Sequence, residues 1–100
     1  MHNISYSKRA EIDLEDAIAY IANTSTKNAL EYLLRYEDKI ELLRLNPQMG
    51  TKCINKNINR DCRVLINESH IIIYNIDEAS NSIFIIRIYH SSVDYANKFE

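Results

Sequence analysis

Residues Ser82-Ile83-Phe84-Ile85-Ile86-Arg87-Ile88-Tyr89-His90 form a run of branched and aromatic side chains that one arginine interrupts. Such side chains suit a pleated backbone, and the run contains neither Gly nor Pro, so we expect a β-strand. Both alternating faces of this strand are largely apolar, which predicts a central position in a sheet, paired on two sides. An arginine in that position needs a structural or functional reason.

Two more strands are predicted before this one, at residues 62–67 and 70–76, because both segments are rich in Val, Ile and Leu. The links at 67–70 and 77–81 are short enough for hairpins, so neighbouring strands should be antiparallel. Residues 3–6 alternate briefly and predict a short first strand. The segment 51–59 is polar and basic, and we expect a loop there, with at most a short strand near Cys53.

The first half of the chain predicts two amphipathic helices, from residue 8 to about 22 and from the polar break at 23–26 to Asn46-Pro47. Ser7 and Ser25 are suitable N-caps. The short link makes an antiparallel helical hairpin. The apolar positions expected to face the core are Ala10, Leu14, Ala17, Ile18 and Ile21 in the first helix and Ala29, Leu33, Tyr36, Ile40 and Leu43 in the second, widened by Leu30, Leu34, Leu42 and Leu45.

Together these elements predict a single α+β domain over residues 1–100. A short N-terminal strand and a helical hairpin pack on one face of a C-terminal antiparallel β-sheet, in the order β-α-α-β-β-β. The tail at 91–100 is polar, and we expect a helical turn or an arm there.

Composition and charge narrow the function classes. The net charge of −2 does not suit a protein that binds nucleic acid through its overall charge. The segment 49–63 is an exception, with four basic residues against one acidic residue. No apolar run approaches the length needed to span a bilayer, and the N-terminus lacks signal-peptide features, so we expect a cytoplasmic protein without a membrane partner.

The two cysteines, Cys53 and Cys62, are nine positions apart. A reducing cytosol disfavours a disulfide, so we expect two small, partly buried apolar side chains. Their spacing is unlike that of a zinc site. No constellation of metal ligands is found, and we expect neither a metal nor a cofactor.

A provisional strand register follows from the short hairpins, with Asn67 opposite His70 and Ile76 opposite Ile83. It separates two faces of the sheet. One face, expected to pack on the helices, carries Cys62, Val64, Ile66, Ile71, Ile73, Phe84, Ile86 and Ile88, with Asn75 and His90 at its ends. The opposite face carries Arg63, Leu65, Asn67, His70, Ile72, Tyr74, Ile76, Ile83, Ile85, Arg87 and Tyr89.

The second of these faces gathers side chains that bind or transfer protons. Arginines hold phosphates or carboxylates, and tyrosine and histidine stack on bases or act as acid and base. Each residue also has a structural explanation, such as a core tyrosine or an arginine bound to Asp61, Asp94 or carbonyl groups. The collection as a whole favours a binding role.

Four groups of residues carry a family resemblance. They are Ala10–Asp16 in the first helix, the turn Leu45-Asn46-Pro47-Gln48-Met49-Gly50, the pair Arg63-Val64-Leu65 and Ile72-Ile73-Tyr74, and Arg87-Ile88-Tyr89-His90 with Asp94. In order and spacing these resemble the motifs of the RelE/ParE superfamily of bacterial type II toxins, on the ParE-like side. The resemblance implies the β-α-α-β-β-β fold and a co-encoded antitoxin that neutralises the toxin.

The resemblance leaves three functions open. ParE-like members poison DNA gyrase, and here the predicted target-binding residues are Lys52, Lys56, Arg60, Arg63, Tyr74 and Arg87. RelE-like members cleave mRNA on the ribosome without a metal, and here the catalytic candidates are Arg63, His70, Arg87, Tyr89 and His90, with Lys52 and Lys56 as further basic residues. The third function is that of a degenerate, non-toxic binding module.

His70 and Ile71 stand where the family usually has a Tyr-Arg pair, whose arginine helps to handle the scissile phosphate in the nucleases. This departure favours the gyrase hypothesis over the nuclease. A homodimer or a toxin–antitoxin hetero-oligomer is compatible with each of the three functions.

Overall fold

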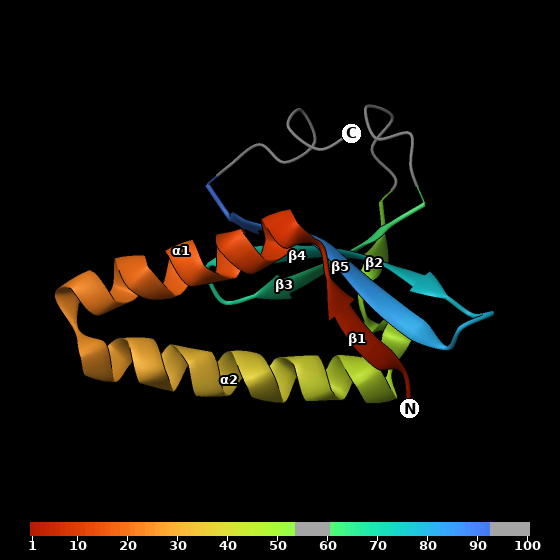
Figure 1. Ribbon diagram of the computed structural model, residues 1–100, viewed down its shortest axis with the longest axis horizontal. Helices are drawn as coiled ribbons and strands as arrows, with labels where there is room; N and C mark the ends of the chain where they lie inside the picture. Colours follow the sequence, from red (N-terminus) through yellow and green to blue (C-terminus); the bar gives the residue numbers. More distant parts are fainter. Residues whose placement is uncertain (54–60, 93–100) are drawn as a thin grey trace.

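The computed structural model describes residues 1–53 and 61–92 (Figure 1). Residues 54–60, which include Lys56, Arg60 and most of the loop predicted at 51–59, lie outside the described residues. So do residues 93–100 of the predicted tail, with Asp94. In chain order the elements are β1 (Asn3–Tyr6), α1 (Lys8–Thr24), α2 (Thr26–Leu45), the 3₁₀ turn η1 (Pro47–Met49), β2 (Thr51–Lys52), β3 (Arg63–Asn67), β4 (His70–Asp77) and β5 (Ser82–His90).

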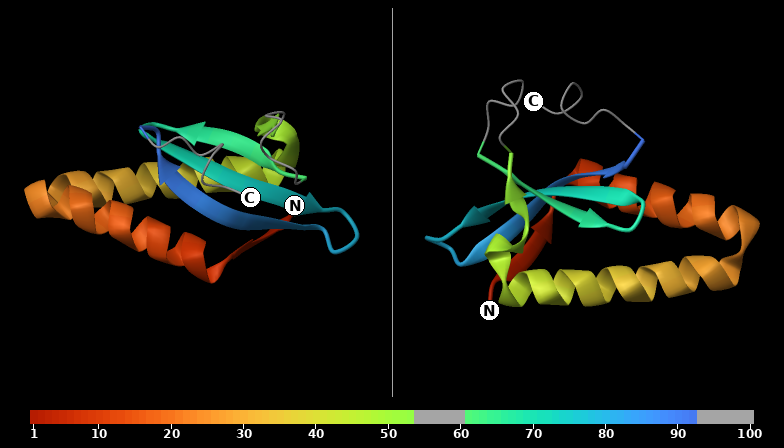
Figure 2. Two further views of the ribbon diagram at one scale, coloured as in Figure 1. Left: turned by 90° about the horizontal axis from the view of Figure 1, so that it is seen from above. Right: turned by 180° about the vertical axis from the view of Figure 1, so that it is seen from behind.

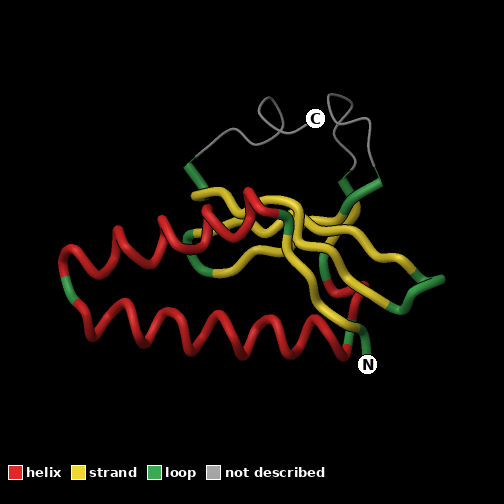
Figure 3. The backbone as a smooth tube through the Cα atoms, in the orientation of Figure 1, coloured by secondary structure: helices red, strands yellow, loops and turns green. Residues whose placement is uncertain are grey.

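The two helices form the expected hairpin, whose connection extends beyond the ends of the strands (Figures 1 and 3). The side chain of Ser7 accepts a hydrogen bond from the Ala10 amide and caps α1, and Ser25 caps α2 in the same way through Asn28. The helix α2 ends at Leu45 because the following Asn46-Pro47 cannot continue it. Both predicted caps are therefore confirmed.

The strands form one five-stranded sheet in the order β1-β5-β4-β3-β2. The hairpin pairs β3–β4 and β4–β5 are antiparallel, with Asn67 opposite His70 and Ile76 opposite Ile83 as predicted. The first strand pairs in parallel with β5, so the sheet is mixed and β5 is indeed a central strand at its N-terminal half. This arrangement confirms the α+β fold class.

The helices pack on the face of the sheet opposite to the one predicted (Figure 2). Leu65, Ile72, Tyr74 and Ile85 share a buried cluster with helix residues such as Tyr36. The face assigned to the helices, with Val64, Ile71, Ile73 and Ile86, forms a separate buried cluster that contains no helix residue. The assignment was wrong because both faces are apolar, so alternation alone cannot tell which of them meets the helices.

An irregularity in β5 also changes which residues share a face. Tyr74 pairs with Ile85 and Ile73 pairs with Arg87, so Ile86 is an extra residue on β5, a β-bulge. After the bulge the alternation is reversed, and Ile88 joins the helix-facing cluster. His90 pairs with His70 in the structure. The unbroken register had predicted these two residues on opposite faces of the sheet.

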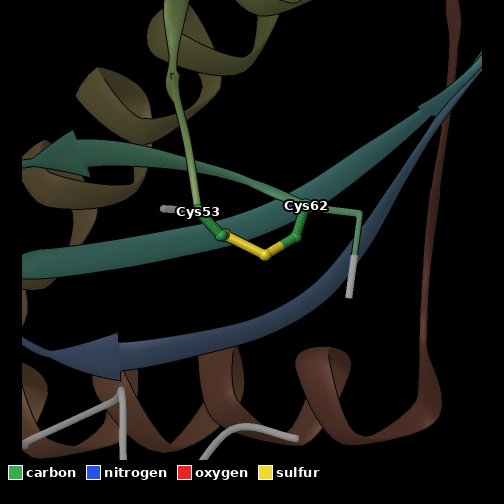
Figure 4. Close-up of a disulfide and its surroundings, with 2 residues drawn as sticks. All are labelled: Cys53 and Cys62. Carbon is green, nitrogen blue, oxygen red and sulfur yellow. A yellow bond between two sulfur atoms is a disulfide. The ribbon is translucent and has the colours of Figure 1, made fainter. Parts of the chain in front are cut away.

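Two other expectations were wrong. Leu30, Leu34, Leu42 and Leu45 of α2 are exposed, not part of the core. Cys53 and Cys62 form a disulfide, shown in Figure 4. The pairing of β2 with β3 brings the two cysteines together, because the amide of Cys53 donates to the carbonyl of Cys62 and their Cα atoms are 5.4 Å apart. No helix within residues 1–53 and 61–92 has the length and hydropathy to cross a membrane.

Candidate functional site

The arginine of β5 forms an ion pair with a carboxylate of α1. The Nε and Nη2 atoms of Arg87 donate to the two oxygens of Asp13 at 2.8 and 3.2 Å. Asp13 also accepts from the backbone amide of Ile88 at 3.0 Å, and its side chain is only 6% exposed. The hydrogen bonds to Asp13 raise the pKa of Arg87 above its ordinary value. Asp13 thus fastens α1 to the part of β5 that lies beyond the parallel pairing with β1.

Tyr89 lies beside this ion pair. The guanidinium carbon of Arg87 is 4.4 Å from the centre of the Tyr89 ring, which is a cation–π contact. The residue is 7% exposed, and its hydroxyl is buried without a hydrogen-bond partner among the described residues. Burial raises the pKa of Tyr89, so the phenol stays neutral near pH 7.

The two histidines at the paired ends of β4 and β5 are in edge-to-face contact, with ring centres 5.5 Å apart. A hydrogen bond of 2.8 Å joins Nδ1 of His70 to the hydroxyl of Tyr32 on α2. Nδ1 of His90 is 2.8 Å from the Ser92 hydroxyl. Burial, and in second place the charge of His90, lowers the pKa of His70. His70 is therefore a neutral imidazole at pH 7.

These groups line a cleft of about 520 Å³ between α1 and the end of β5. We name it the α1–β5 cleft. Its walls contain two carboxylates, Asp13 and Asp16, but no lysine or arginine among the described residues. The other lining residues are Ala17, Tyr20, Ile21, Ser69, His70, Ile88, Tyr89, His90 and Ser92. The cleft therefore offers aromatic rings, imidazoles and negative charge.

A second hollow of about 570 Å³ lies between the N-terminus and the turn η1, where His2, Pro47 and Glu78 line it. None of the predicted site residues that the structure describes lines it. No group of three or more His, Cys, Asp or Glu side chains is placed for metal binding within the described part of the chain.

Two predicted site residues support the turn before β2, away from the α1–β5 cleft. Arg63 donates to the carbonyl of Gly50 at 2.7 Å and to that of Gln48 at 3.3 Å. The hydroxyl of Tyr74 donates to the carbonyl of Pro47 at 2.7 Å and accepts from the amide of Gly50 at 3.0 Å. Tyr74 is fully buried.

The structure therefore divides the predicted residues into two groups. His70, Arg87, Tyr89 and His90 lie together at or beside the cleft, and Arg63 and Tyr74 hold the turn η1. Lys52 is exposed on the edge strand β2. Sequence reasoning missed Asp13, Asp16, Tyr20 and Tyr32, because it placed the candidate site on the strands and the basic segment and none of these four residues lies there. The available signal was Arg87 itself, since an arginine in an apolar strand requires a carboxylate or carbonyl partner.

Comparison with solved structures shows which proteins share the fold. A chain in the chromosomal ParDE toxin–antitoxin system from P. aeruginosa superposes with a TM-score of 0.69 at 17% identity, over 90% of this chain and 96% of that one. A chain of the RelBE2 toxin–antitoxin complex from Mycobacterium tuberculosis gives a TM-score of 0.61 at 14% identity, over 89% and 96%. A metal-bound toxin from Helicobacter pylori gives 0.58 at 22% identity, over 92% and 97%.

No curated protein matches the sequence. The family model for the ParE toxin of the type II toxin–antitoxin system parDE matches residues 4–95, which is nearly the whole chain. The matched segment includes both helices, the described strands except Asn3 of β1, and the α1–β5 cleft. The chain therefore belongs to the family of ParE toxins of type II toxin–antitoxin systems.

Proposed function

We propose that this toxin inhibits growth by binding a target protein, DNA gyrase, and that a cognate antitoxin neutralises it. Membership of the ParE family supports the toxin assignment. Chains of the same fold are found in ParDE and RelBE toxin–antitoxin systems, and this supports an antitoxin as partner. The choice of a protein target over RNA rests on the charge of the α1–β5 cleft.

The ion pair between Arg87 and Asp13 is the observation that carries this choice. A metal-independent ribonuclease must hold a scissile phosphate, and a positively charged side chain normally does so. Here the charge of Arg87 is balanced by Asp13, and Asp16 adds a second carboxylate to the cleft. The described lining of this cleft therefore offers no lysine or arginine to an RNA phosphate, and this favours a protein target.

Of the predicted target-binding residues that the structure describes, Lys52 has the position to contact gyrase directly. It is exposed on β2, at one edge of the sheet. Arg63, Tyr74 and Arg87 act in this proposal by holding the surface in shape, since each is engaged by carbonyl or carboxylate groups of the protein itself.

One observation favours the ribonuclease as a second candidate. His70 and His90 are adjacent, and the lowered pKa of His70 leaves a neutral imidazole that can accept a proton from the RNA 2′-OH. In that mechanism His90 or Tyr89 would protonate the leaving oxygen. The two candidates therefore depend on different residues.

The experiment incubates the purified toxin with DNA gyrase and supercoiled plasmid, and in parallel with translating ribosomes on a defined mRNA. We expect linear plasmid after denaturation and protease treatment, and intact mRNA. The variant H70Q/H90Q should keep its effect on gyrase, and K52E should weaken it. Cleaved mRNA and unaffected plasmid, with cleavage abolished by H70Q/H90Q, would overturn the proposal.

A further inference from the structure

Four leucines on the outer side of α2 are about half exposed. Their exposed fractions are 58% for Leu30, 53% for Leu34, 49% for Leu42 and 56% for Leu45. Figure 1 shows α2 along one margin of the molecule, with α1 and the sheet on its other side. In a monomer such a row of apolar side chains would remain in contact with water.

The leucines are arranged almost symmetrically along the helix. Leu34 and Leu42 each lie four residues from Asp38, and Leu30 and Leu45 lie eight and seven residues from it. Residues at these spacings share one face of an α-helix, since four residues make slightly more than one turn. We call this face, with Asp38 at its centre, the α2 leucine stripe.

We infer that the α2 leucine stripe is a homodimer interface in which two copies of α2 pack antiparallel across a two-fold axis at Asp38. A two-fold interface requires a surface that is complementary to itself. Antiparallel packing about Asp38 places Leu34 of one copy against Leu42 and Leu45 of the other, and Leu30 against Leu45. The near-symmetry of the stripe provides this self-complementarity.

The charges on the stripe also fit a second copy better than a strongly charged partner. The exposed charged residues around the leucines have mixed signs, with Lys27 and Arg35 on the same helix side as Glu31, Asp38 and Glu41. A stripe that binds a highly basic or acidic segment would carry one dominant sign. Arg35 is paired with Glu68 of its own chain, with Nε and Oε2 2.8 Å apart. In the antiparallel pair Arg35 of each copy also lies within one helical turn of Asp38 of the other.

The arrangement predicts a weak dimer. The stripe from Leu30 to Leu45 is roughly 22 Å long. Two such stripes bury on the order of 1,000 Å² in total, at the lower end of specific interfaces. Asp38 meets its own copy at the axis, and this like-charge contact limits the affinity. The inference does not depend on the target of the toxin.

The first test is sedimentation velocity of the full-length chain from about 1 to 300 μM, a range that brackets weak association. We expect a shift from monomer to dimer with concentration. L34E should remain a monomer over the whole range, and circular dichroism should show the helical content of the wild type.

D38N should tighten the dimer about fivefold, the effect of removing the repulsion between two like charges about 4 Å apart in water. The control Y20E changes an exposed aromatic residue of α1 outside the stripe and should dimerise like the wild type.

The second test uses the geometry of the axis. A cysteine at position 38 (D38C) should cross-link to its own copy under mild oxidation. K27C lies on the same helix face, but roughly 16 Å along the helix from the axis, and it should not cross-link. A wild-type chain that is monomeric at 300 μM, or a dimer that L34E leaves intact, would overturn the inference. Cross-linking of K27C in preference to D38C would also overturn it.

Discussion

At the scale of single residues, Arg87 shows how a charge is accommodated in an apolar strand. Its guanidinium donates hydrogen bonds to both oxygens of Asp13 and lies over the face of the Tyr89 ring. Asp13 accepts a third hydrogen bond from the backbone amide of Ile88. Every charged group in this contact therefore has a partner, which is the condition for burying it. The same contact joins α1 to β5 and balances the charge of Arg87 beside the cleft.

Removing the charge of Asp13 tests this arrangement. D13N leaves the guanidinium of Arg87 partly buried without a counter-charge, so the free energy of unfolding should fall by about 2–3 kcal/mol. Urea unfolding monitored by circular dichroism measures the change. The matched control is R9Q, because Arg9 is exposed and lies 3.6 Å from the same carboxylate. It should change stability by less than about 0.5 kcal/mol, and an equal effect of both variants would contradict this account.

The lowered pKa of His70 should make the free energy of unfolding depend on pH. Its pKa in the folded protein is lowered from the ordinary value of 6.5, so the unfolded chain binds more protons just below that value. The contribution of neutral His70 to the free energy of unfolding is therefore fully present above the pKa of the unfolded chain. It is lost as the pH falls through the lower pKa of the folded protein. H70N should show a flatter curve of unfolding free energy between about pH 7.5 and 5. Parallel curves for the wild type and H70N would show that His70 is not responsible.

At the scale of elements, the turn η1 and the strand β2 are held by side chains from distant strands. Tyr74 of β4 and Arg63 of β3 bind four backbone groups of Pro47, Gln48 and Gly50. Gly50 is required here by close contact, because a Cβ atom would lie 2.7 Å from the Tyr74 hydroxyl and 2.8 Å from the Val64 carbonyl. This contact explains the Pro-x-x-Gly turn in physical terms.

The variant G50A should lower the free energy of unfolding by about 1–3 kcal/mol, because a backbone carbonyl cannot move aside cheaply. Y74F removes the closest hydroxyl but leaves the Gly50 amide without its acceptor. In a double-mutant cycle the effect of G50A should be smaller in the Y74F background. Strict additivity of the two changes in unfolding free energy would contradict the proposed clash.

The disulfide between Cys53 and Cys62 closes a short loop over a sequence separation of nine residues. Restriction of the unfolded chain by a loop of this size contributes roughly 2–3 kcal/mol. Unfolding in the presence of dithiothreitol should show this loss in the wild type. The variant C53S/C62S should be less stable by a similar amount and insensitive to the reductant. A wild-type protein whose stability dithiothreitol does not change would contradict the prediction.

At the scale of the whole molecule, periodicity and caps were sufficient to predict the helices, the strands and the hairpin register. They were not sufficient to orient the sheet, because both faces of β4 and β5 are apolar. The bulge at Ile86 could not be predicted either, since no Gly, Pro or polar residue marks it within the apolar run 83–86. The exposed leucines were misassigned for a related reason, because apolar spacing alone does not distinguish a core face from an interface.

The candidate site was predicted only in part. Arg87, Tyr89, His70 and His90 were identified as a group from their place in the strands, and the structure brings them to one region. Their partners Asp13 and Tyr32 come from helices more than thirty positions away in the chain, and no local pattern links them. The charge of the cleft, on which the proposed function depends, is therefore visible only in three dimensions.

The most direct measurement follows induction of the toxin in growing cells. Gyrase–DNA cleavage complexes and the 5′ and 3′ ends of mRNA are mapped in the same culture. We expect gyrase-linked DNA breaks to accumulate and no new codon-phased mRNA ends to appear. Codon-phased mRNA cuts without gyrase complexes would contradict this expectation.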